Sequence, residues 1–469
     1  MDIGHNNPQH ILVLGAGLAG LTAADHLSKA GYYLKVLEAE AHVGGLARTL
    51  KHHDFRFDVG GHRFVTNNTQ LEKHVRHMLG DDCLQVTRSS KIFLRNRYFD
   101  YPLKPFNALM GFGPWTSTRI LFDYAREQLK SRYGRQATPV SLQDWVIQNF
   151  GRRMFDIYFK DYSEKVWGID CTRIDMRWVE QRIQGLSLGK AIKTALKLNK
   201  TEALPTLSRG FLYPRWGIGQ IAETMANEIR QVNPILTQCR VTRIHHKSRH
   251  IHSVDIQQNA FKTTLNAEEF ISTIPLQALI KTLRPLPPGR VLAAANHLRS
   301  RDLVTVTLML NLDKVTDHTW IYTPEKSIPF GRIHEPTNWS RAMAPAGKTL
   351  LVIEYFCFRG DAIWSNSDAA LVELTIKHLH KLGFIQPQDV IDSVVTRIPN
   401  AYPLFEVGYD EYCQIIYDYL AGFDNLFTVG RGGLFRYYNM DHTMLAGASA
   451  ARHITQSSLI KTVNTGLVA

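Results

Sequence analysis

The first forty residues alternate between short apolar runs and a segment in which apolar positions recur every three or four residues. In HILVLGAGLAGLTAADHLSKAGYYLKVLEAE, residues 10–40, Ile, Leu and Val cluster at both ends, and glycines follow the first run. Apolar runs of this length favour buried strands, whereas the three- and four-residue spacing favours a helix. The pattern predicts a strand, a tight turn, a helix and a second strand.

Later segments predict a helical stretch followed by two groups of strands. Residues from about 104 to 200 have a mainly helical pattern, as in LQDWVIQNFGRRMFDIYF. The other expectations are paired strands in ILTQCRVTRIHH and SVDIQQNAF, strands of a second sheet in LVTVTLMLNL and TLLVIEYFCF, a short buried strand in NLFTVG, and a helix of small residues in HTMLAGASAARHI. The chain is therefore expected to leave its first unit and to return to it near the C-terminus.

The composition is typical of a globular chain with two or three structural units. Of the 469 residues, 44% are hydrophobic and 21% are charged, and no apolar run approaches the roughly 18–20 residues that cross a bilayer. The N-terminal MDIGHNNPQH lacks the cationic and apolar regions of a secretory signal. The five cysteines are scattered without a CxxC pair, which argues against a metal site and for reduced thiols in the cytoplasm.

The formal net charge of +13 suggests an anionic partner. The basic residues are spread along the chain rather than gathered in one run, which disfavours nucleic acid. An anionic small-molecule substrate or the face of an anionic membrane fits the charge equally well. Most of these charges are expected to form a generally basic surface.

A glycine motif follows the first predicted strand. Gly15, Gly17 and Gly20 form G-x-G-x-x-G between ILVLG and LTAADHL. The first glycine allows the turn, the second lets backbone N–H groups approach a pyrophosphate, and the third lets the helix pack closely. Glu38 ends the next strand, where a carboxylate can accept hydrogen bonds from a ribose hydroxyl. Together these features favour a dinucleotide site over a glycine-rich packing turn.

Three further motifs resemble those of the large FAD family that holds amine oxidases, protoporphyrinogen oxidases and phytoene desaturases. AEAHVGGLARTL resembles the extended fingerprint, CRVTRI the strand whose backbone meets the adenine, and FTVGRGG with DHTMLAGASAARHI the closing motif. The resemblance implies a bound FAD, with contacts from Gly44, Gly45, Arg48, Val241, Gly430, Arg431 and Met444. Nothing in the sequence resembles a separate NAD(P)H domain.

The predicted fold class is α/β with an α+β second domain. The resemblance implies a Rossmann-type FAD-binding domain that is discontinuous over residues 8–68, 208–275 and 424–456. Residues 69–207 are expected to form an inserted, largely helical cap region, and residues 276–423 a substrate domain with a mixed or antiparallel sheet.

One branch of that family matches further. FDVGGHRF, residues 57–64, resembles the stretch that lies beside the isoalloxazine in UDP-galactopyranose mutases, especially the longer type, and the resemblance covers most of the chain. It implies that Gly60 and Gly61 lie against the flavin ring and that His62 contacts this loop. His62 can equally be a core histidine bonded to a backbone carbonyl, and the two roles are compatible.

Other stretches extend the resemblance to a substrate site. DYSEKVWGIDCTRIDMRWVEQRI and GRIHEPTNWS resemble the segments that carry two diphosphate-binding arginines, here Arg182 and Arg332. With His62 these are the implied catalytic residues, and Trp167, Asn338, Trp339, Tyr402, Tyr437 and Asn439 are the implied substrate contacts. Guanidinium groups match diphosphate oxygens bidentately, although either arginine alone is as well explained by a surface ion pair. Trp339 replaces the tyrosine usual in the family, and no stretch matches a uridine pocket.

The resemblance implies a sugar-nucleotide mutase that needs reduced FAD and an external reductant. The reduced flavin N5 attacks the anomeric carbon of a nucleoside diphosphate sugar, and pyranose and furanose forms interconvert without net redox change. The alternative is an oxidoreductase of the amine oxidase, protoporphyrinogen oxidase or desaturase type that transfers hydride to the flavin. A third alternative is a catalytically idle flavoprotein that serves as a binding subunit. Two buried guanidiniums near the flavin would favour the mutase.

Overall fold

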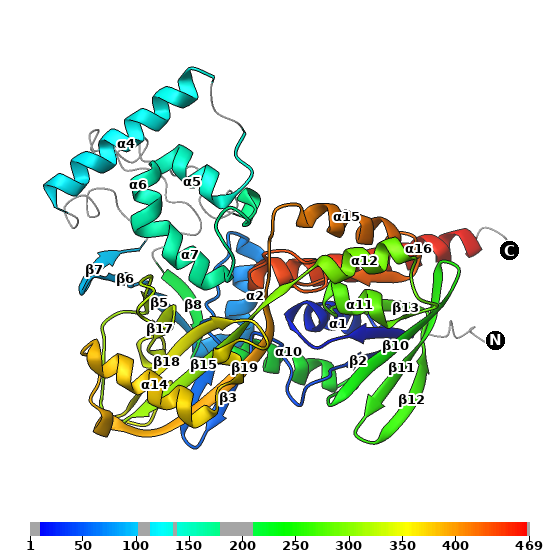
Figure 1. Ribbon diagram of the computed structural model, residues 1–469. Helices are drawn as coiled ribbons and strands as arrows, with labels where there is room; N and C mark the ends of the chain where they lie inside the picture. The colour runs from blue at the N-terminus through cyan, green and yellow to red at the C-terminus, as the bar shows by residue number, and fades with distance from the viewer. Residues whose placement is uncertain (1–9, 102–112, 135–137, 179–209, 467–469) are drawn as a thin grey trace.

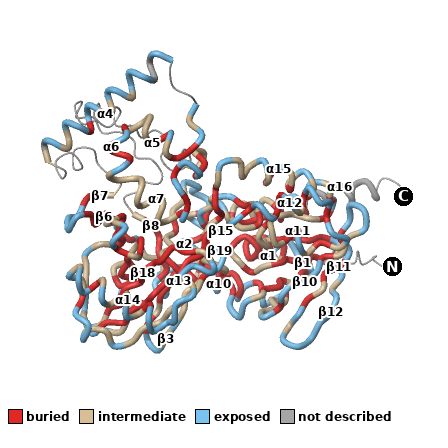
Figure 2. Tube along the Cα trace, viewed as in Figure 1, coloured by how far each residue is buried: buried red, intermediate tan, exposed pale blue. Residues whose placement is uncertain are grey.

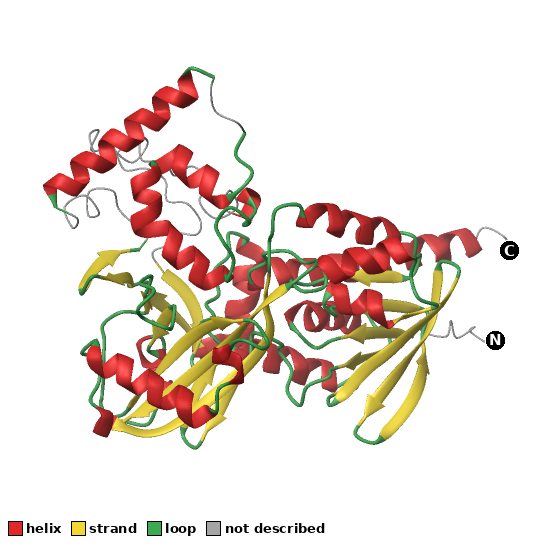
Figure 3. Cartoon of the chain, viewed as in Figure 1, coloured by secondary structure: helices red, strands yellow, loops and turns green. Residues whose placement is uncertain are grey.

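The computed structural model describes residues 10–101, 113–134, 138–178 and 210–466. Figure 1 shows three regions: a parallel sheet wrapped by helices, a second sheet beside it, and a helical region that projects above the second sheet. Figure 3 shows that the first two regions combine strands with helices packed around them, whereas the third is built mainly of helices. This arrangement confirms the predicted α/β fold with an α+β second part.

The parallel sheet has the order β20-β13-β1-β2-β9. Its centre is β1 (Ile11–Leu14), which pairs in parallel with β2 (Leu34–Leu37) and β13 (Glu269–Ser272). The outer strands are β9 (Ile235–Leu236) and β20 (Leu426–Thr428). Because β20 comes from the end of the chain and pairs with β13, the expected return of the chain to its first unit is confirmed.

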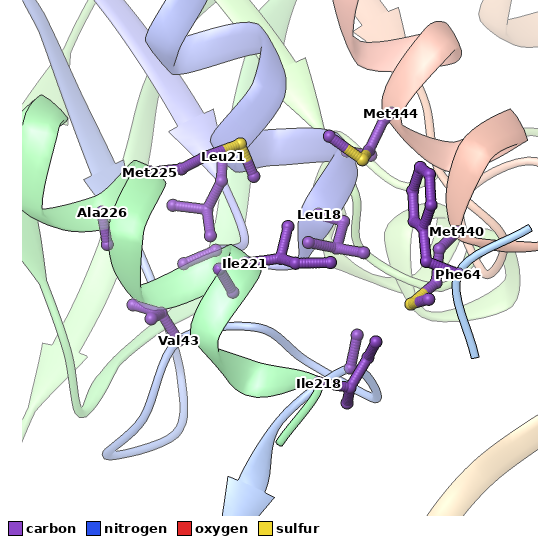
Figure 4. Close-up of a cluster of buried hydrophobic side chains, with 14 of the residues drawn as sticks. Leu18, Leu21, Val43, Phe64, Ile218, Ile221, Met225, Ala226, Met440 and Met444 are labelled. Carbon is purple, nitrogen blue, oxygen red and sulfur yellow. The ribbon is translucent and has the colours of Figure 1, made fainter. Parts of the chain in front are cut away.

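Helix α1 (Leu18–Lys29) follows β1, as predicted, and packs against α16 (Met440–Gly466). A Cβ on Gly447 would lie 2.2 Å from the Ala19 carbonyl oxygen, so the small residues of α16 permit the close approach of the two helices. Helix α10 (Gly219–Arg230) packs on another side of α1. Figure 4 shows the resulting apolar cluster, to which all three helices contribute: Leu18, Leu21, Val43, Phe64, Ile218, Ile221, Met225, Ala226, Met440 and Met444.

An antiparallel ribbon extends from the Rossmann-type unit. It consists of β10 (Cys239–Lys247), β11 (His250–Gln258) and β12 (Phe261–Asn266), with the short β14 (Leu283–Arg284) parallel to β10. The predicted pairing of ILTQCRVTRIHH with SVDIQQNAF is therefore confirmed.

The second sheet is mixed and has the order β19-β15-β18-β17-β16-β6-β7. Its strands are β6 (Ser90–Leu94), β7 (Arg97–Asp100), β15 (Ser300–Leu310), β16 (Trp320–Tyr322), β17 (Arg332–His334), β18 (Thr349–Cys357) and β19 (Val390–Pro403). Nearly every residue of β15 and β18 is buried, as expected for continuous apolar runs that are covered on both faces. Helix α14 (Asp368–Lys381) covers one face with Leu371 and Leu379.

The helical region contains α4 (Pro114–Arg132), α5 (Leu142–Phe150), α6 (Arg152–Met154), a π-helical turn (Phe155–Phe159) and α7 (Lys160–Trp167). Helix α5 begins at a capping box formed by Ser141 and Asp144. Figure 2 shows that α4 is largely exposed, whereas the two sheets contain most of the buried residues. In the described part of the chain, no helix combines the length and apolar character needed to span a bilayer.

Within the described ranges, the remaining elements connect these regions or pack against them. They are β3 (Thr49–His52), β4 (Phe55–Asp58), β5 (Cys83–Thr87), β8 (Gly210–Pro214), α2 (Thr69–Leu79), α11 (Leu276–Thr282), α12 (Gly289–His297), α13 (Ala362–Ser365), α15 (Tyr409–Leu420), and four 3-10 turns at Gly80–Asp82, Pro336–Asn338, Arg341–Met343 and Pro387–Asp389.

Candidate active site

A cavity of about 2470 Å3 lies where the parallel sheet, the second sheet and the helical region meet. Its walls include the turn after β1, the FDVGGHRF loop, α7, the end of β19 and the segment before α16. Pockets for drug-sized ligands measure roughly 300–1,000 Å3. This cavity is therefore large enough for a dinucleotide cofactor and a second ligand.

The turn after β1 has the geometry that its glycines predict. Gly15 has a φ of +112°, and its N–H donates a hydrogen bond of 2.7 Å to the Leu37 carbonyl. A Cβ on Gly20 would lie 2.0 Å from the Gly15 carbonyl oxygen, so a larger residue would separate the turn from the helix. A Cβ on Gly17 would meet none of the described atoms within 4 Å, and Gly17 lines the cavity at the start of α1. This end of the cavity fits a phosphate group.

Glu38 faces this turn. Its carboxylate accepts hydrogen bonds from the N–H groups of Ala16 at 2.7 Å and Glu40 at 2.9 Å. The residue is buried apart from a small surface on the cavity wall. The backbone therefore holds the carboxylate in the position from which it could accept a ribose hydroxyl.

The second glycine pair folds back onto the first turn. The Gly44 N–H donates to the Ala16 carbonyl at 2.8 Å, and a Cβ on Gly45 would lie 3.4 Å from the Gly17 Cα. Arg48 follows on the same cavity wall, and its Nε is buried with no hydrogen-bond partner among the described residues. Two converging glycine turns and an orphaned guanidinium nitrogen fit a diphosphate between them.

The other predicted cofactor contacts divide into two groups. Val241, Gly430 and Arg431 line the same cavity. Met444 does not, because its side chain belongs to the apolar cluster between α1 and α16 and is 1% exposed (Figure 4). The direct contact between Met444 and the cofactor is therefore not supported by this arrangement.

Asp58 anchors the FDVGGHRF loop. Its buried carboxylate accepts hydrogen bonds from the hydroxyls of Thr49 and Tyr213, both at 2.6 Å, and from the Ile218 N–H at 3.0 Å. Burial raises the pKa of this carboxyl to about 6, although the three donors oppose the shift.

The glycines of this loop face an indole ring and a leucine. A Cβ on Gly61 would lie 2.3 Å from the Trp320 ring, and one on Gly60 would lie 3.3 Å from Leu303. Gly61 and Trp320 line the cavity, and Gly60 is set back from its wall. Trp320 could not be identified from the sequence, because Gly61 and Trp320 are far apart in the chain and no motif links them.

His62 lines the cavity and is also bonded to the backbone. Its Nδ1 lies 3.1 Å from the Gly60 carbonyl oxygen, which can only accept, so Nδ1 carries the proton. Burial lowers the pKa of His62 to about 4, and the positive charges of Arg431 and Arg332 add to this effect. His62 is therefore neutral near pH 7, with the lone pair on Nε2.

Arg332 also lines the cavity, and it is paired. On the sheet it lies opposite Glu354, and its guanidinium forms an ion pair with that buried carboxylate. It donates a hydrogen bond of 2.6 Å to the Tyr402 hydroxyl and lies over Trp320 and Phe356, at 5.3 and 4.8 Å from the ring centres. Burial alone would lower the pKa of Arg332, but the neighbouring Glu354 carboxylate and Tyr402 together outweigh it, and the pKa lies above its ordinary value.

Glu354 is a site residue that the sequence analysis did not identify. It is 0% exposed, and besides pairing with Arg332 it accepts a hydrogen bond of 3.0 Å from the Gly61 N–H. It therefore connects the second sheet to the FDVGGHRF loop. The sequence did contain a signal for Glu354, because it is the single carboxylate in the apolar run TLLVIEYFCF. A charge in such a buried strand is expected to be paired with another group.

Aromatic residues from three segments converge on the same wall. Trp167 and Trp178 form an edge contact at 4.9 Å, and Trp178 contacts Tyr437 at 6.4 Å. The Arg431 guanidinium lies 4.7 Å from the Tyr437 ring and 4.9 Å from the Tyr402 ring. Four of the predicted substrate contacts line the cavity: Trp167, Tyr402, Tyr437 and Asn439.

Two predicted substrate contacts lie elsewhere. The Asn338 amide donates to the carbonyls of Thr316 at 2.7 Å and His318 at 3.0 Å, and the Trp339 indole donates to Thr319 at 2.9 Å. Neither residue lines the cavity. The 3-10 turn that follows β17 carries them behind Trp320, where they support its strand, so their predicted contact with substrate is corrected. Arg182 lies outside the described residues.

A group of tyrosines forms the end of the cavity in the helical region. The rings of Tyr101 and Tyr322 stack at 4.4 Å, and Tyr162 meets Tyr322 edge-on at 5.7 Å. Burial raises the pKa of Tyr322 to about 12 and that of Tyr158 well above its ordinary value, so these hydroxyls remain protonated. Flat, amphipathic walls of this kind can stack against a sugar or an aromatic ring.

Lys165 fixes the loop that leads into Arg332. Its ammonium donates to the carbonyls of Thr323 and Glu325, both at 2.6 Å, and of Ile328 at 2.9 Å. These acceptors belong to the connection between β16 and β17, so α7 is tied directly to the strand that carries Arg332.

One group of residues could hold a metal ion in the described part of the chain. His52, His53 and Asp392 place ligand atoms within 4.8 Å of one another. The group lies outside the cavity, and His52 is already hydrogen-bonded to Asp392 at 2.8 Å.

Comparison with known proteins places this geometry in a family. The family profile described as "Flavin containing amine oxidoreductase" matches residues 18–455. A probable UDP-galactopyranose mutase of Klebsiella pneumoniae is 23% identical over 170 residues, which are 35% of this chain and 42% of that protein. L-amino acid oxidase Cdc18 of Crotalus durissus cumanensis is 31% identical over 114 residues, which are 21% of this chain and 23% of the oxidase.

The chain thus spans less than half the length of these curated relatives. A crystal structure of reduced UDP-galactopyranose mutase has the same fold, with a TM-score of 0.82, 20% identity and coverage of 96% of both chains. The predicted resemblance is confirmed, and the family match supports a flavin in the cavity. Because the family profile spans nearly the whole sequence, the chain belongs to the flavin-containing amine oxidoreductase family.

Proposed function

We propose that the protein is a FAD-dependent mutase that interconverts the pyranose and furanose forms of a nucleoside diphosphate sugar. The observation that carries the proposal is the Arg332 guanidinium on the cavity wall, bonded to Tyr402 and close to the His62 loop. A guanidinium and a phenol are suitable donors for a diphosphate leaving group.

The cavity residues fit FAD along one continuous wall. The turns at Gly17 and Gly45 and the Arg48 guanidinium would hold the cofactor diphosphate, and Glu38 would hold the adenosine ribose. Gly61 and His62 would lie toward the flavin ring. When bound in its reduced form, FAD supplies an electron-rich nitrogen for the anomeric carbon.

The protein residues then have defined tasks. Arg332 and Tyr402 hold the diphosphate while its bond to the anomeric carbon breaks and later forms again. Arg431 lies over the Tyr402 ring and adds a second guanidinium in the same region. Preorganised donors in a largely apolar site stabilise the departing charge more strongly than water does.

His62 is suited to the sugar hydroxyls rather than to the diphosphate. Its Nδ1–H is committed to the Gly60 carbonyl, so Nε2 can accept a hydrogen bond or a proton from a hydroxyl. A pKa of about 4 keeps the ring neutral, which prevents it from acting as a third fixed cation. The sugar leaves with the same atoms and electrons with which it arrived, so no oxidant is consumed.

Two observations favour hydride-transferring oxidoreductase activity as a second candidate. Glu354 compensates the charge of Arg332, and the end of the cavity in the helical region is lined by aromatic and apolar side chains, among them Tyr101, Met154 and Tyr158. An uncharged or aromatic substrate would bind favourably at that end of the cavity. Such an enzyme would pass electrons from flavin to oxygen or another acceptor at every turnover.

The two candidates predict opposite results in a pair of assays, one anaerobic and one in air. The flavin-loaded protein is incubated anaerobically, with and without dithionite, with a panel of nucleoside diphosphate hexoses, and the sugars are followed by NMR. The mutase predicts furanose formation only after reduction, and loss of activity in Arg332→Lys but not in Arg341→Lys, an exposed control position. No isomerisation of any sugar nucleotide, with substrate-dependent hydrogen peroxide in air, would instead support the oxidoreductase.

A further inference from the structure

Helix α4 carries an apolar stripe on the face turned away from the protein. Trp115, Phe122 and Leu129 recur every seven residues, and Tyr133 follows four residues later, so all four lie on one side of the helix. Their exposed fractions are 70, 70, 54 and 76%. The opposite side carries Ile120, which is 1% exposed and packs against Met154.

The outer position of α4 makes this stripe accessible. Figure 1 shows α4 along the far edge of the helical region, with α5, α6 and α7 between it and the two sheets. Figure 2 shows exposed residues along most of its length. Four large apolar side chains in one row are more than the isolated exposed residues common on protein surfaces.

Positive charge borders the stripe on one side. Arg119 and Arg126 lie next to it at helical spacing and are exposed, and Lys130, whose charge is compensated by Glu127, lies on the same side. Arg119 lies 4.7 Å above the Trp115 ring. The acidic residues of the helix are turned toward the protein: Asp123 pairs with Arg153 at 3.4 Å, and Glu127 pairs with Lys130 at 2.8 Å.

We propose that α4 docks the protein onto the surface of an anionic phospholipid bilayer. A helix lying in the membrane interface places Trp, Phe and Leu at the acyl boundary and its cations among the headgroups. Trp115 at one end of α4 and Tyr133 just beyond the other end supply rings with an apolar body and a polar atom, which suit that boundary. The net charge of +13 adds a longer-range attraction to the same surface.

The basic flank of α4 favours an anionic bilayer over a second copy of the chain as the partner of the stripe. In a twofold dimer through α4, the same basic flank would face itself, and Arg119 and Arg126 of both copies would be brought together. An anionic bilayer neutralises these residues instead. The proposal concerns only α4 and does not depend on the reaction in the cavity.

The test is co-sedimentation of the full-length flavin-loaded protein with vesicles. Phosphatidylcholine vesicles with about 30% phosphatidylglycerol should bind the protein, pure phosphatidylcholine should bind it at least about tenfold less, and high salt should weaken binding. The double variant Phe122→Glu/Arg126→Glu should lose about tenfold or more in partitioning. The matched control is Phe261→Glu/Lys262→Glu on the exposed β12, which makes the same change in charge and should bind as the unchanged protein does.

Three results would overturn the proposal. One is absence of binding to anionic vesicles, and another is equal loss of binding in the two double variants. The third is a concentration-dependent dimer that the Phe122→Glu/Arg126→Glu change abolishes while vesicles bind nothing, which would assign the stripe to a second copy. Thermal unfolding of each variant checks that the exposed substitutions leave the fold intact.

Discussion

Arg332 and Glu354 lie opposite each other on adjacent strands and form an ion pair at the wall of the cavity. Glu354 also accepts a hydrogen bond of 3.0 Å from the Gly61 N–H, so one carboxylate contacts both the arginine and the FDVGGHRF loop. The position of Arg332 is therefore set by the sheet and tied to the loop that is proposed to face the flavin.

Replacement of Glu354 by Ala should destabilise the fold strongly. It leaves a buried guanidinium unpaired, which costs on the order of 3–5 kcal/mol, and it removes the acceptor of the Gly61 N–H. Urea unfolding measures the change, and Glu354→Gln should lose less because it retains an acceptor for Gly61. Asp368→Ala removes the partner of Arg397 in an ion pair on the surface and should change stability by less than about 1 kcal/mol. Equal losses in the Glu354→Ala and Asp368→Ala variants would show that the buried pair is not important for stability.

The Asp58 carboxyl should impose a pH dependence on stability. Its pKa in the folded protein is about 6, above the roughly 4 expected in the unfolded chain, so between these values the folded state holds a proton that the unfolded state has released. Stability should therefore fall as pH rises from about 4 to about 6, by up to about 3 kcal/mol, and then level off.

The Asp58→Asn variant isolates this effect. The difference in unfolding free energy between the unchanged protein and the variant should decrease across that interval, because asparagine does not titrate. Asp54→Asn in the same hairpin is the control, since Asp54 is exposed. A difference that stays constant from about pH 4 to about pH 7 would contradict a raised pKa at Asp58.

Tyr402→Phe should reduce turnover without affecting the fold. The change removes the hydroxyl that accepts the 2.6 Å hydrogen bond from Arg332 and that would contact the diphosphate. A loss of about tenfold in kcat/KM is expected, which corresponds to one hydrogen bond involving a charged group. Tyr412→Phe, outside the cavity and stacked on His297, should have normal activity. Full activity in Tyr402→Phe would remove this residue from the substrate site.

The local features of this protein were predictable from its sequence, whereas the contacts between distant segments were not. Gly15, Gly17 and Gly20 act within one turn, where the backbone conformation and close packing require glycine and can therefore be read from the sequence. The contact of Gly61 with Trp320 joins segments about 260 residues apart in the sequence, and nothing local encodes it. Arg332 and Tyr402, which were selected by the resemblance of their segments, both line the cavity.

The same reasoning failed for side-chain direction. Asn338 and Trp339 lie in a matching segment, yet the turn after β17 directs them behind Trp320. Met444 lies in the closing helix, but its side chain packs between helices rather than toward the cavity. Resemblance located these segments, and local backbone geometry decided which of their side chains reach the cavity.

The most direct test is to titrate the flavin-loaded protein with a nucleoside diphosphate and follow the flavin absorbance. If Arg332 holds a diphosphate beside the flavin, the spectrum should change saturably. The affinity should then fall about tenfold or more in Arg332→Lys and stay unchanged in Arg341→Lys. A spectrum that no nucleoside diphosphate alters, or equal affinities in the two variants, would contradict the account.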